Sequence, residues 1–167
     1  MTRLFVLLAV VMLAFAPAWA APKDKKDKKD DNLGDNRRPS GGDIANEAGK
    51  AKFEKGRAVE KKYKNGDIIR FVPVETNKNS DTVSDFAKGA VLGILDIDRK
   101  GDQTGLPAGK YHVYVKQVKN DWMSFYEKDG HIVKDAVGVR YLDPGEPEPK
   151  FKDGGDCVVY RHWEFCY

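Results

Sequence analysis

The sequence predicts a mainly β fold, an antiparallel β-sandwich or a partly open barrel, with one short helix at its N-terminal end. Three observations lead to this fold class. Several short segments are rich in β-branched and aromatic residues, turn signals separate these segments, and no regular series of helical segments lies between them. Alternating strands and helices indicate a parallel sheet, whereas this pattern favours antiparallel pairing.

Residues 1–20 have the features of a cleavable secretory signal. Arg3 precedes 13 apolar residues, Leu4 to Ala16, which are followed by Pro17-Ala18-Trp19-Ala20, a small-x-small cleavage pattern. Because spanning a bilayer takes about 20 apolar residues, we expect cleavage near Ala20 and no transmembrane segment in the mature chain. The predicted location is therefore periplasmic or secreted.

Residues 21–42 are expected to form a disordered Lys/Asp-rich tether. Lys23 to Arg38 contains seven basic and five acidic residues, with Leu33 as the one large apolar side chain. Such a segment buries too little apolar surface to offset its ordering entropy. Without residues 1–20 the chain holds 28 Lys and Arg against 26 Asp and Glu, so its charge of +2 does not indicate a nucleic-acid partner.

Residues 43–65 are expected to contain the short helix. Ile44, Ala48, Ala51, Ala58 and Val59 fall roughly on one helical face. Asp43 is a suitable N-cap, and Asn65-Gly66 is a suitable stop signal. The apolar face is narrow, and Gly49 and Gly56 weaken it, so the pattern predicts one short helix.

Residues 66–167 are expected to form the β domain. Residues 68–74 and 111–116 have strand composition, and the second segment alternates apolar with polar side chains. Residues 90–97 are apolar on both faces, which is typical of a buried strand or of a buried helical turn. Residues 143–149 contain three prolines and are expected to form an extended loop.

The dipeptide Asp129-Gly130 predicts a β-hairpin over residues 121–140, because both residues tolerate positive φ. This turn pairs Tyr126 with Val133 and Trp122 with Val137. It places Met123, Phe125 and Ile132 on the opposite face of the hairpin.

Leu106-Pro107-Ala108-Gly109-Lys110-Tyr111, followed by the alternating strand and by this hairpin, resembles exported bacterial β-sandwich modules of the immunoglobulin-like or transthyretin-like kind. The resemblance is architectural, and it implies no functional residue.

Cys157 and Cys166 are expected to form a disulfide, because the signal implies an oxidising compartment. If the chain reverses at Arg161-His162, the two cysteines fall opposite each other in a hairpin. A metal-binding or redox-active pair is the alternative, but the spacing lacks the Cys-x-x-Cys pattern. The sequence therefore predicts a structural bridge.

A metal site is a weaker hypothesis, with His162, Asp96, Asp98 and Asp102 as its candidate ligands. The aspartates partly match a calcium loop, but Lys100 and Pro107 occupy positions that require oxygen ligands. His162 suits copper or zinc if the neighbouring thiols are free. No cofactor is expected.

The aromatic residues on the predicted strands offer a further hypothesis, because one sheet face exposing them would stack on a sugar or a peptide. The candidate residues are Tyr114, Trp122, Tyr126 and Trp163. Core packing is the alternative for these side chains.

We therefore expect a non-enzymatic, exported β domain that binds a protein or glycan partner of the cell envelope. A periplasmic metal-binding protein is the first alternative, and clustered histidines and aspartates would favour it. A small hydrolase is the second, although the sequence contains no Gly-x-Ser-x-Gly or His-Glu-x-x-His motif.

Overall fold

The computed structural model describes residues 37–75, 82–100 and 105–167. The predicted signal and the Lys/Asp run of the tether lie outside these ranges, as does Asp102. Within the described ranges, no helix is both long enough and apolar enough to cross a membrane.

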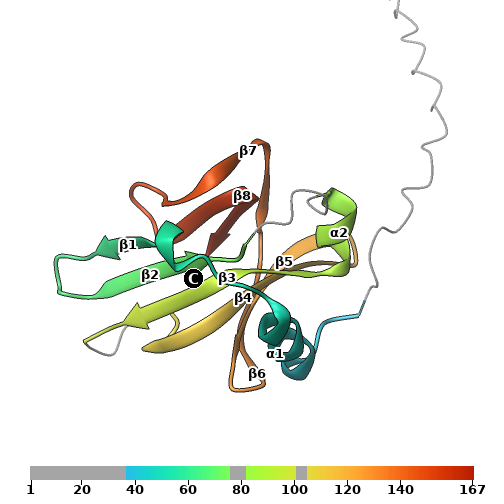
Figure 1. The fold of residues 1–167 in the computed structure, drawn as a ribbon, viewed down its shortest axis with the longest axis horizontal. Helices are drawn as coiled ribbons and strands as arrows, with labels where there is room; N and C mark the ends of the chain where they lie inside the picture. Colours follow the sequence, from blue (N-terminus) through green and yellow to red (C-terminus); the bar gives the residue numbers. More distant parts are fainter. Residues whose placement is uncertain (1–36, 76–81, 101–104) are drawn as a thin grey trace, which may run out of the picture. The chain divides into compact units, whose positions relative to one another are not determined.

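The described residues form eight β-strands, two short α-helices and one 3-10 turn (Figure 1). The helices are α1 (Gly41–Lys50) and α2 (Val83–Lys88), and the 3-10 turn is Lys55–Arg57. The strands are β1 (Val59–Lys62), β2 (Ile68–Pro73), β3 (Ala90–Asp98), β4 (Gly109–Val118), β5 (Asp121–Lys128), β6 (His131–Val137), β7 (Arg140–Phe151) and β8 (Cys157–Cys166).

The strands form two antiparallel sheets in a sandwich-like arrangement, so the predicted fold class is confirmed. The larger sheet has the order β1-β2-β3-β4-β5-β6, and the smaller one pairs β7 with β8. Each strand of the larger sheet pairs with its neighbours in sequence, which makes it a meander. Immunoglobulin domains have Greek-key connections, so the resemblance extends to the layout and not to the strand order.

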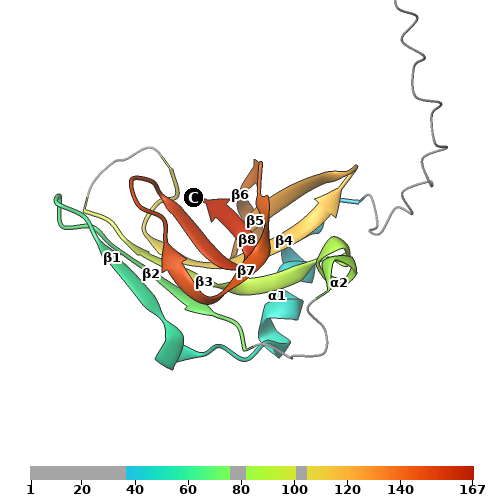
Figure 2. The same ribbon diagram turned by 90° about the horizontal axis from the view of Figure 1, so that it is seen from above.

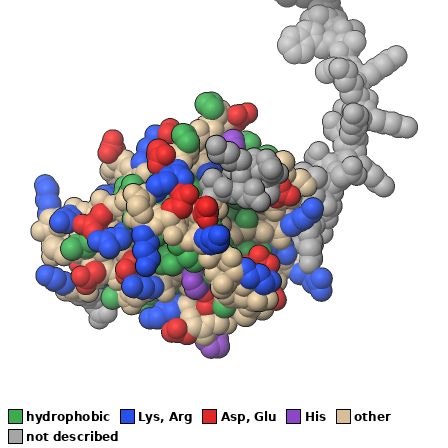
Figure 3. Space-filling view, viewed as in Figure 1, with side chains coloured by type: hydrophobic (Ala, Val, Ile, Leu, Met, Phe, Trp, Pro, Cys, Tyr) green, Lys and Arg blue, Asp and Glu red, His purple; other side chains and the backbone are tan. Residues whose placement is uncertain are grey.

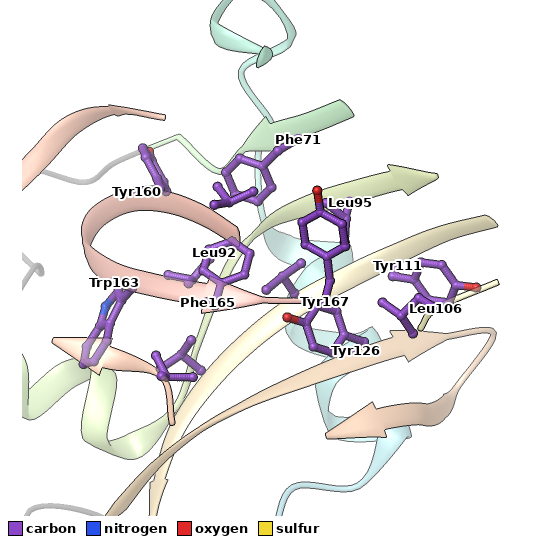
Figure 4. Packing of buried hydrophobic residues seen from close by; sticks show 14 of the residues in the cluster. Phe71, Leu92, Leu95, Leu106, Tyr111, Tyr126, Tyr160, Trp163, Phe165 and Tyr167 are labelled. Carbon is purple, nitrogen blue, oxygen red and sulfur yellow. The ribbon is translucent and has the colours of Figure 1, made fainter. Parts of the chain in front are cut away.

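The larger sheet is curved, with β7 and β8 on its concave side and α1 on its other side (Figure 2). The main core lies between the two sheets and contains aromatic side chains from β2, β4, β5 and β8. Figure 4 shows several of these rings, and Phe71 packs edge-to-face against Phe165 at 5.5 Å between centroids. A smaller core places Ile44 of α1 against Tyr114 and Phe125.

The period-2 alternation predicted for β4 is confirmed, but the predicted half-burial is wrong, because Tyr114 and Lys116 on the second face are also buried. Tyr111, Val113 and Val115 belong to the main core, whereas Tyr114 faces the smaller core beneath α1. The apolar run 90–97 is strand β3, and a register shift between Val91 and Gly93 interrupts its pairing with β4. Such a shift explains why apolar residues of both parities are buried there.

The hairpin at Asp129-Gly130 is confirmed, with φ values of 51° and 81° at these two residues. Its two faces are also as predicted, because Met123 and Phe125 lie in the smaller core and Tyr126 lies in the main core. The predicted register is wrong by one residue. Tyr126 pairs with Lys134 instead of Val133, because a bulge interrupts the ladder between Tyr126 and Glu127.

A helix forms in the predicted region, but it begins and ends earlier than predicted. Helix α1 begins earlier than expected because Ser40 is the N-cap, and Asp43 completes a capping box with it. The helix ends at Lys50, and Val59–Lys62 forms strand β1. Asn65-Gly66 therefore lies in the turn between β1 and β2, where Gly66 has a φ of 89°.

The expected loop 143–149 is part of strand β7, which is a correction. Pairing with β8 is discontinuous, with register shifts between Tyr141 and Glu146 and between Glu146 and Lys150. Pro144, Pro147 and Pro149 fall within or beside these interruptions. Strands tolerate proline at edges and bulges, because the ladder there does not need its missing N–H.

The disulfide between Cys157 and Cys166 is confirmed, with a Cα–Cα distance of 4.0 Å. Both cysteines are ends of the single strand β8, so the chain turns back on itself within that strand. Arg161, at the predicted reversal, has a φ of 55°. Strand β8 pairs with β7, whereas the sequence predicted that the two halves of residues 157–166 pair with each other.

Candidate functional site

A cavity of about 540 Å³ opens where α1, α2 and the adjoining ends of β2 and β3 meet. Lys50 and Glu47 of α1 contribute to its lining, as do Glu75 after β2 and Arg161 in β8. These residues are distant in sequence, so the cavity exists only in the folded chain.

The acidic side chains of the cavity differ from the other glutamates of the protein. Within the described ranges, Glu54, Glu60, Glu127, Glu146, Glu148 and Glu164 each contact a cationic or imidazole side chain. Glu47 and Glu75 have no such contact with the described residues, and both are exposed. Among the described residues, no cationic side chain therefore occupies these two carboxylates.

Apolar side chains form the rest of the lining. Phe86 is buried in the main core and also borders the cavity, as do Val74 and Val91. Gly89 lies beside them with a φ of 113°, and a Cβ atom there would come within 1.8 Å of the Tyr114 hydroxyl. Glycine is therefore required where this wall packs against Tyr114.

Arg161 brings a buried positive charge to the cavity. Its residue is 9% exposed, and the guanidinium carbon lies 5.3 Å from the centroid of the Tyr160 ring. The Tyr160 hydroxyl in turn donates to the Val74 carbonyl at 3.0 Å. The left-handed φ of Arg161 is uncommon for a residue with a side chain, and such conformations gather at functional sites.

Asp85 contributes a third carboxylate to the cavity, but this carboxylate caps the N-terminus of α2. Its side chain accepts from the Thr82 hydroxyl at 2.7 Å and from the Thr82 amide, and this capping box lowers the pKa of Asp85. A carboxylate already engaged in a cap has less capacity for a ligand. Glu47 and Glu75 are therefore the stronger candidates for ligand contacts.

Three of the four aromatic residues predicted to stack on a ligand are buried. Tyr126 and Trp163 are completely buried, and Tyr114 is 6% exposed beneath α1. These three belong to the interior because β7–β8 covers one face of the larger sheet and α1 covers the other, so they are not accessible for stacking on a sugar. Trp122 is partly exposed, and its ring packs 4.3 Å from that of Trp163.

The structure does not bring the described candidate metal ligands together. His162 donates from Nδ1 to the Leu142 carbonyl at 2.9 Å, and Asp96 lies 3.5 Å from the Lys110 ammonium. In the part of the chain that the structure describes, the side chains close enough to share a metal ion are Cys157, Glu164 and Cys166. Neither His162 nor Asp98 belongs to that group.

A histidine–carboxylate pair was not predicted from the sequence. His112 Nδ1 lies 2.6 Å from Glu127 Oε2, and the second oxygen of Glu127 accepts from the Gly130 amide at 2.6 Å. Glu127 is 1% exposed, so these contacts satisfy a buried carboxylate. The two residues are direct cross-strand partners in β4 and β5, a register that the hairpin and the alternating strand together could have indicated.

The cavity residues Glu47, Glu75 and Arg161 were also not predicted. No local motif marks them, because the cavity is assembled from separate elements. A left-handed arginine has no sequence signature of the kind that Asp-Gly provides for a turn.

The described surface carries mixed charge. In the view of Figure 3, acidic and basic side chains are interspersed over the domain.

No protein-family model matches the sequence, and comparisons with curated proteins and with solved structures give no significant match.

Proposed function

We propose that the chain is an exported, non-enzymatic binding module whose cavity between α1 and α2 takes a basic side chain of a partner protein. One observation carries this proposal. The cavity is lined by Glu47 and Glu75, the two glutamates that have no cationic partner among the described residues. A lysine or arginine would place its charge near these carboxylates.

The remaining lining suits the stem of such a side chain. Lysine and arginine bury their aliphatic carbons against apolar surface while the charged head stays at the rim. Val74, Phe86 and Val91 provide apolar surface inside the cavity. Lys50 and Arg161 add positive charge there, which would select against a partner segment with several basic side chains.

The export part of the proposal is supported by the residue pattern of positions 1–20 and by the disulfide. Disulfides persist in oxidising compartments, including the periplasm and the extracellular space. The binding part does not need a catalytic group. Among the described residues, no histidine lines this cavity or a further one of about 340 Å³ beside β1 and β7.

The test is a titration of isotope-labelled protein with two short peptides that are identical except for one lysine, replaced by norleucine in the second. We expect the lysine peptide to shift the amide resonances of Gly89 and Val91, which line the cavity. The double variant Glu47→Gln/Glu75→Gln should weaken this binding by at least tenfold, or about 1.4 kcal/mol.

The matched control is Glu60→Gln/Glu146→Gln, which removes two glutamates with ion-pair partners elsewhere on the domain. The control should bind the lysine peptide as the unmodified protein does. Equal binding of both peptides, or equal losses in the two double variants, would contradict the proposal.

A further inference from the structure

The two ends of β8 bring three side chains with metal-binding groups close together. The ligand atoms of Cys157, Glu164 and Cys166 all lie within 4.8 Å of one another. Cys166 is exposed, and Cys157 and Glu164 are partly exposed, so an ion can reach them. This group is separate from the cavity described above.

Hydrogen bonds hold the two cysteines together independently of the sulfur–sulfur bond. The Tyr167 amide donates to the Asp156 carbonyl at 3.1 Å, which links the residues just outside the two cysteines. The Lys152 amide donates to the Cys157 carbonyl at 3.0 Å, and the Tyr126 hydroxyl donates to the Cys166 carbonyl at 2.6 Å. The thiols of a reduced chain would therefore remain side by side.

The third ligand is also held in position. The Lys152 ammonium lies 2.6 Å from Glu164 Oε1, and Phe165, the next residue, is completely buried in the main core. This arrangement reduces the rotamer freedom that Glu164 would lose on binding an ion, although the ion must compete with Lys152 for the carboxylate. Thiolate and carboxylate ligands together suit zinc and its heavier relative cadmium.

We propose that the chain, while both cysteines are thiols, binds one Zn²⁺ or Cd²⁺ ion through Cys157, Cys166 and Glu164, with water in the fourth position. Each thiol releases one proton as its sulfur binds the ion, so no electrons are transferred. A newly made chain carries thiols and needs no reductant to reach this state. A two-electron oxidant, such as a small-molecule disulfide, that takes one electron from each bound thiolate forms the sulfur–sulfur bond and releases the ion.

The test starts with the protein purified from its producing cells. A phosphine reduces the disulfide to two thiols and is itself oxidised to the phosphine oxide. Cadmium is then titrated without oxygen, and the ultraviolet thiolate-to-cadmium charge-transfer band is measured. We expect saturation at one ion per chain, with two sulfur ligands and at least one oxygen ligand by X-ray absorption.

Glu164→Gln should lower the cadmium affinity at least tenfold, and Cys157→Ser/Cys166→Ser should abolish the band. The matched control is Glu146→Gln, which removes another lysine-paired glutamate of the β7–β8 sheet and should leave the affinity unchanged. Circular dichroism of each reduced variant reports whether the fold persists.

Two results would overturn the proposal. One is equal cadmium affinity of the unmodified, Glu164→Gln and Glu146→Gln proteins, which would show that the carboxylate is not a ligand. The other is loss of the β signal on reduction together with binding of more than one ion per chain, which would show flexible thiols instead of a formed site.

Discussion

The two faces of the six-stranded sheet are buried in different ways. On the concave face, β7–β8 closes a core that is dense in aromatic rings, including Phe71, Tyr160 and Trp163. On the other face, α1 contributes one large buried side chain, Ile44, over Tyr114 and Phe125. Because hydrophobic stabilisation follows the apolar area removed from water, the concave face should contribute most of the stability.

The cavity that we propose as a binding site lies at the border between these two regions. Helix α1 supplies Glu47 and Lys50, whereas Phe86 and Arg161 belong to the side that carries the main core. Because α1 buries fewer large side chains than β7–β8, we expect the α1 side of the cavity to open more readily than the side that carries the main core.

The largest effect is expected for Trp163→Ala on the concave face. Trp163 is completely buried, and its ring lies 5.3 Å from that of Phe86 and 5.4 Å from that of Tyr141. We expect the free energy of unfolding to fall by about 3–5 kcal/mol, because truncation leaves a large void. Chemical denaturation measures this loss, and Val137→Ala, at a side chain that is 69% exposed, is the control.

Removal of the disulfide should also weaken the concave side. Cys157→Ser/Cys166→Ser opens a short loop, so the loss should be about 2–3 kcal/mol. The hydrogen bond of the Tyr126 hydroxyl to the Cys166 carbonyl should keep β8 in place in the variant. Chemical denaturation gives the loss in stability. If the variant loses its near-ultraviolet circular dichroism in the absence of denaturant, the disulfide alone holds β8 in place.

Ile44→Ala tests the opposite face. Ile44 is completely buried, and we expect a loss of about 2 kcal/mol, at the low end for such truncations because α1 can adjust its position. Hydrogen exchange should accelerate at the amides of 41–50 and remain slow in β3 to β5. Equal acceleration throughout the sheet would contradict the separation of the two faces.

Ser40→Ala should have a smaller effect on the same helix. The Ser40 hydroxyl accepts from the Asp43 amide at 3.1 Å, and loss of an N-cap costs about 1 kcal/mol. Helix exchange rates measure the loss, with Ser40→Asp as a variant that should restore most of it. Similar exchange rates in the alanine and aspartate variants would show that the cap is unimportant here.

Alkaline pH should reveal the burial of Tyr114 beneath α1. Burial, followed by the nearby Glu47 and Asp43, raises the pKa of Tyr114 from 10.0 to about 12. The folded state therefore holds its proton more tightly than the unfolded state, so this contribution to stability is complete below pH 10 and is lost as the pH rises towards 12. Tyr114→Phe should flatten the fall in stability between these values, as measured by denaturation at successive pH values. An unchanged slope would contradict the contribution of this side chain.

The sequence by itself determined the elements whose signals are local. The alternation of Tyr111, Val113 and Val115 defines a strand with these residues on one face, although the second face of β4 is covered as well. Asp129-Gly130 defines the hairpin because few residues adopt two successive positive φ values. The disulfide also follows from the sequence, since the chain offers one possible pair of cysteines.

Tertiary structure decided what covers each strand and therefore which side chains remain available. The start of α1 is an exception, because Ser40 and Asp43 form a capping box, which is a local signal. Residues 143–149 look like a loop because of their prolines, and only β8 supplies the partner that makes them a strand. The aromatic side chains became core, and Glu47, Glu75 and Arg161 came together, because long-range packing and not local conformation brings such residues into contact.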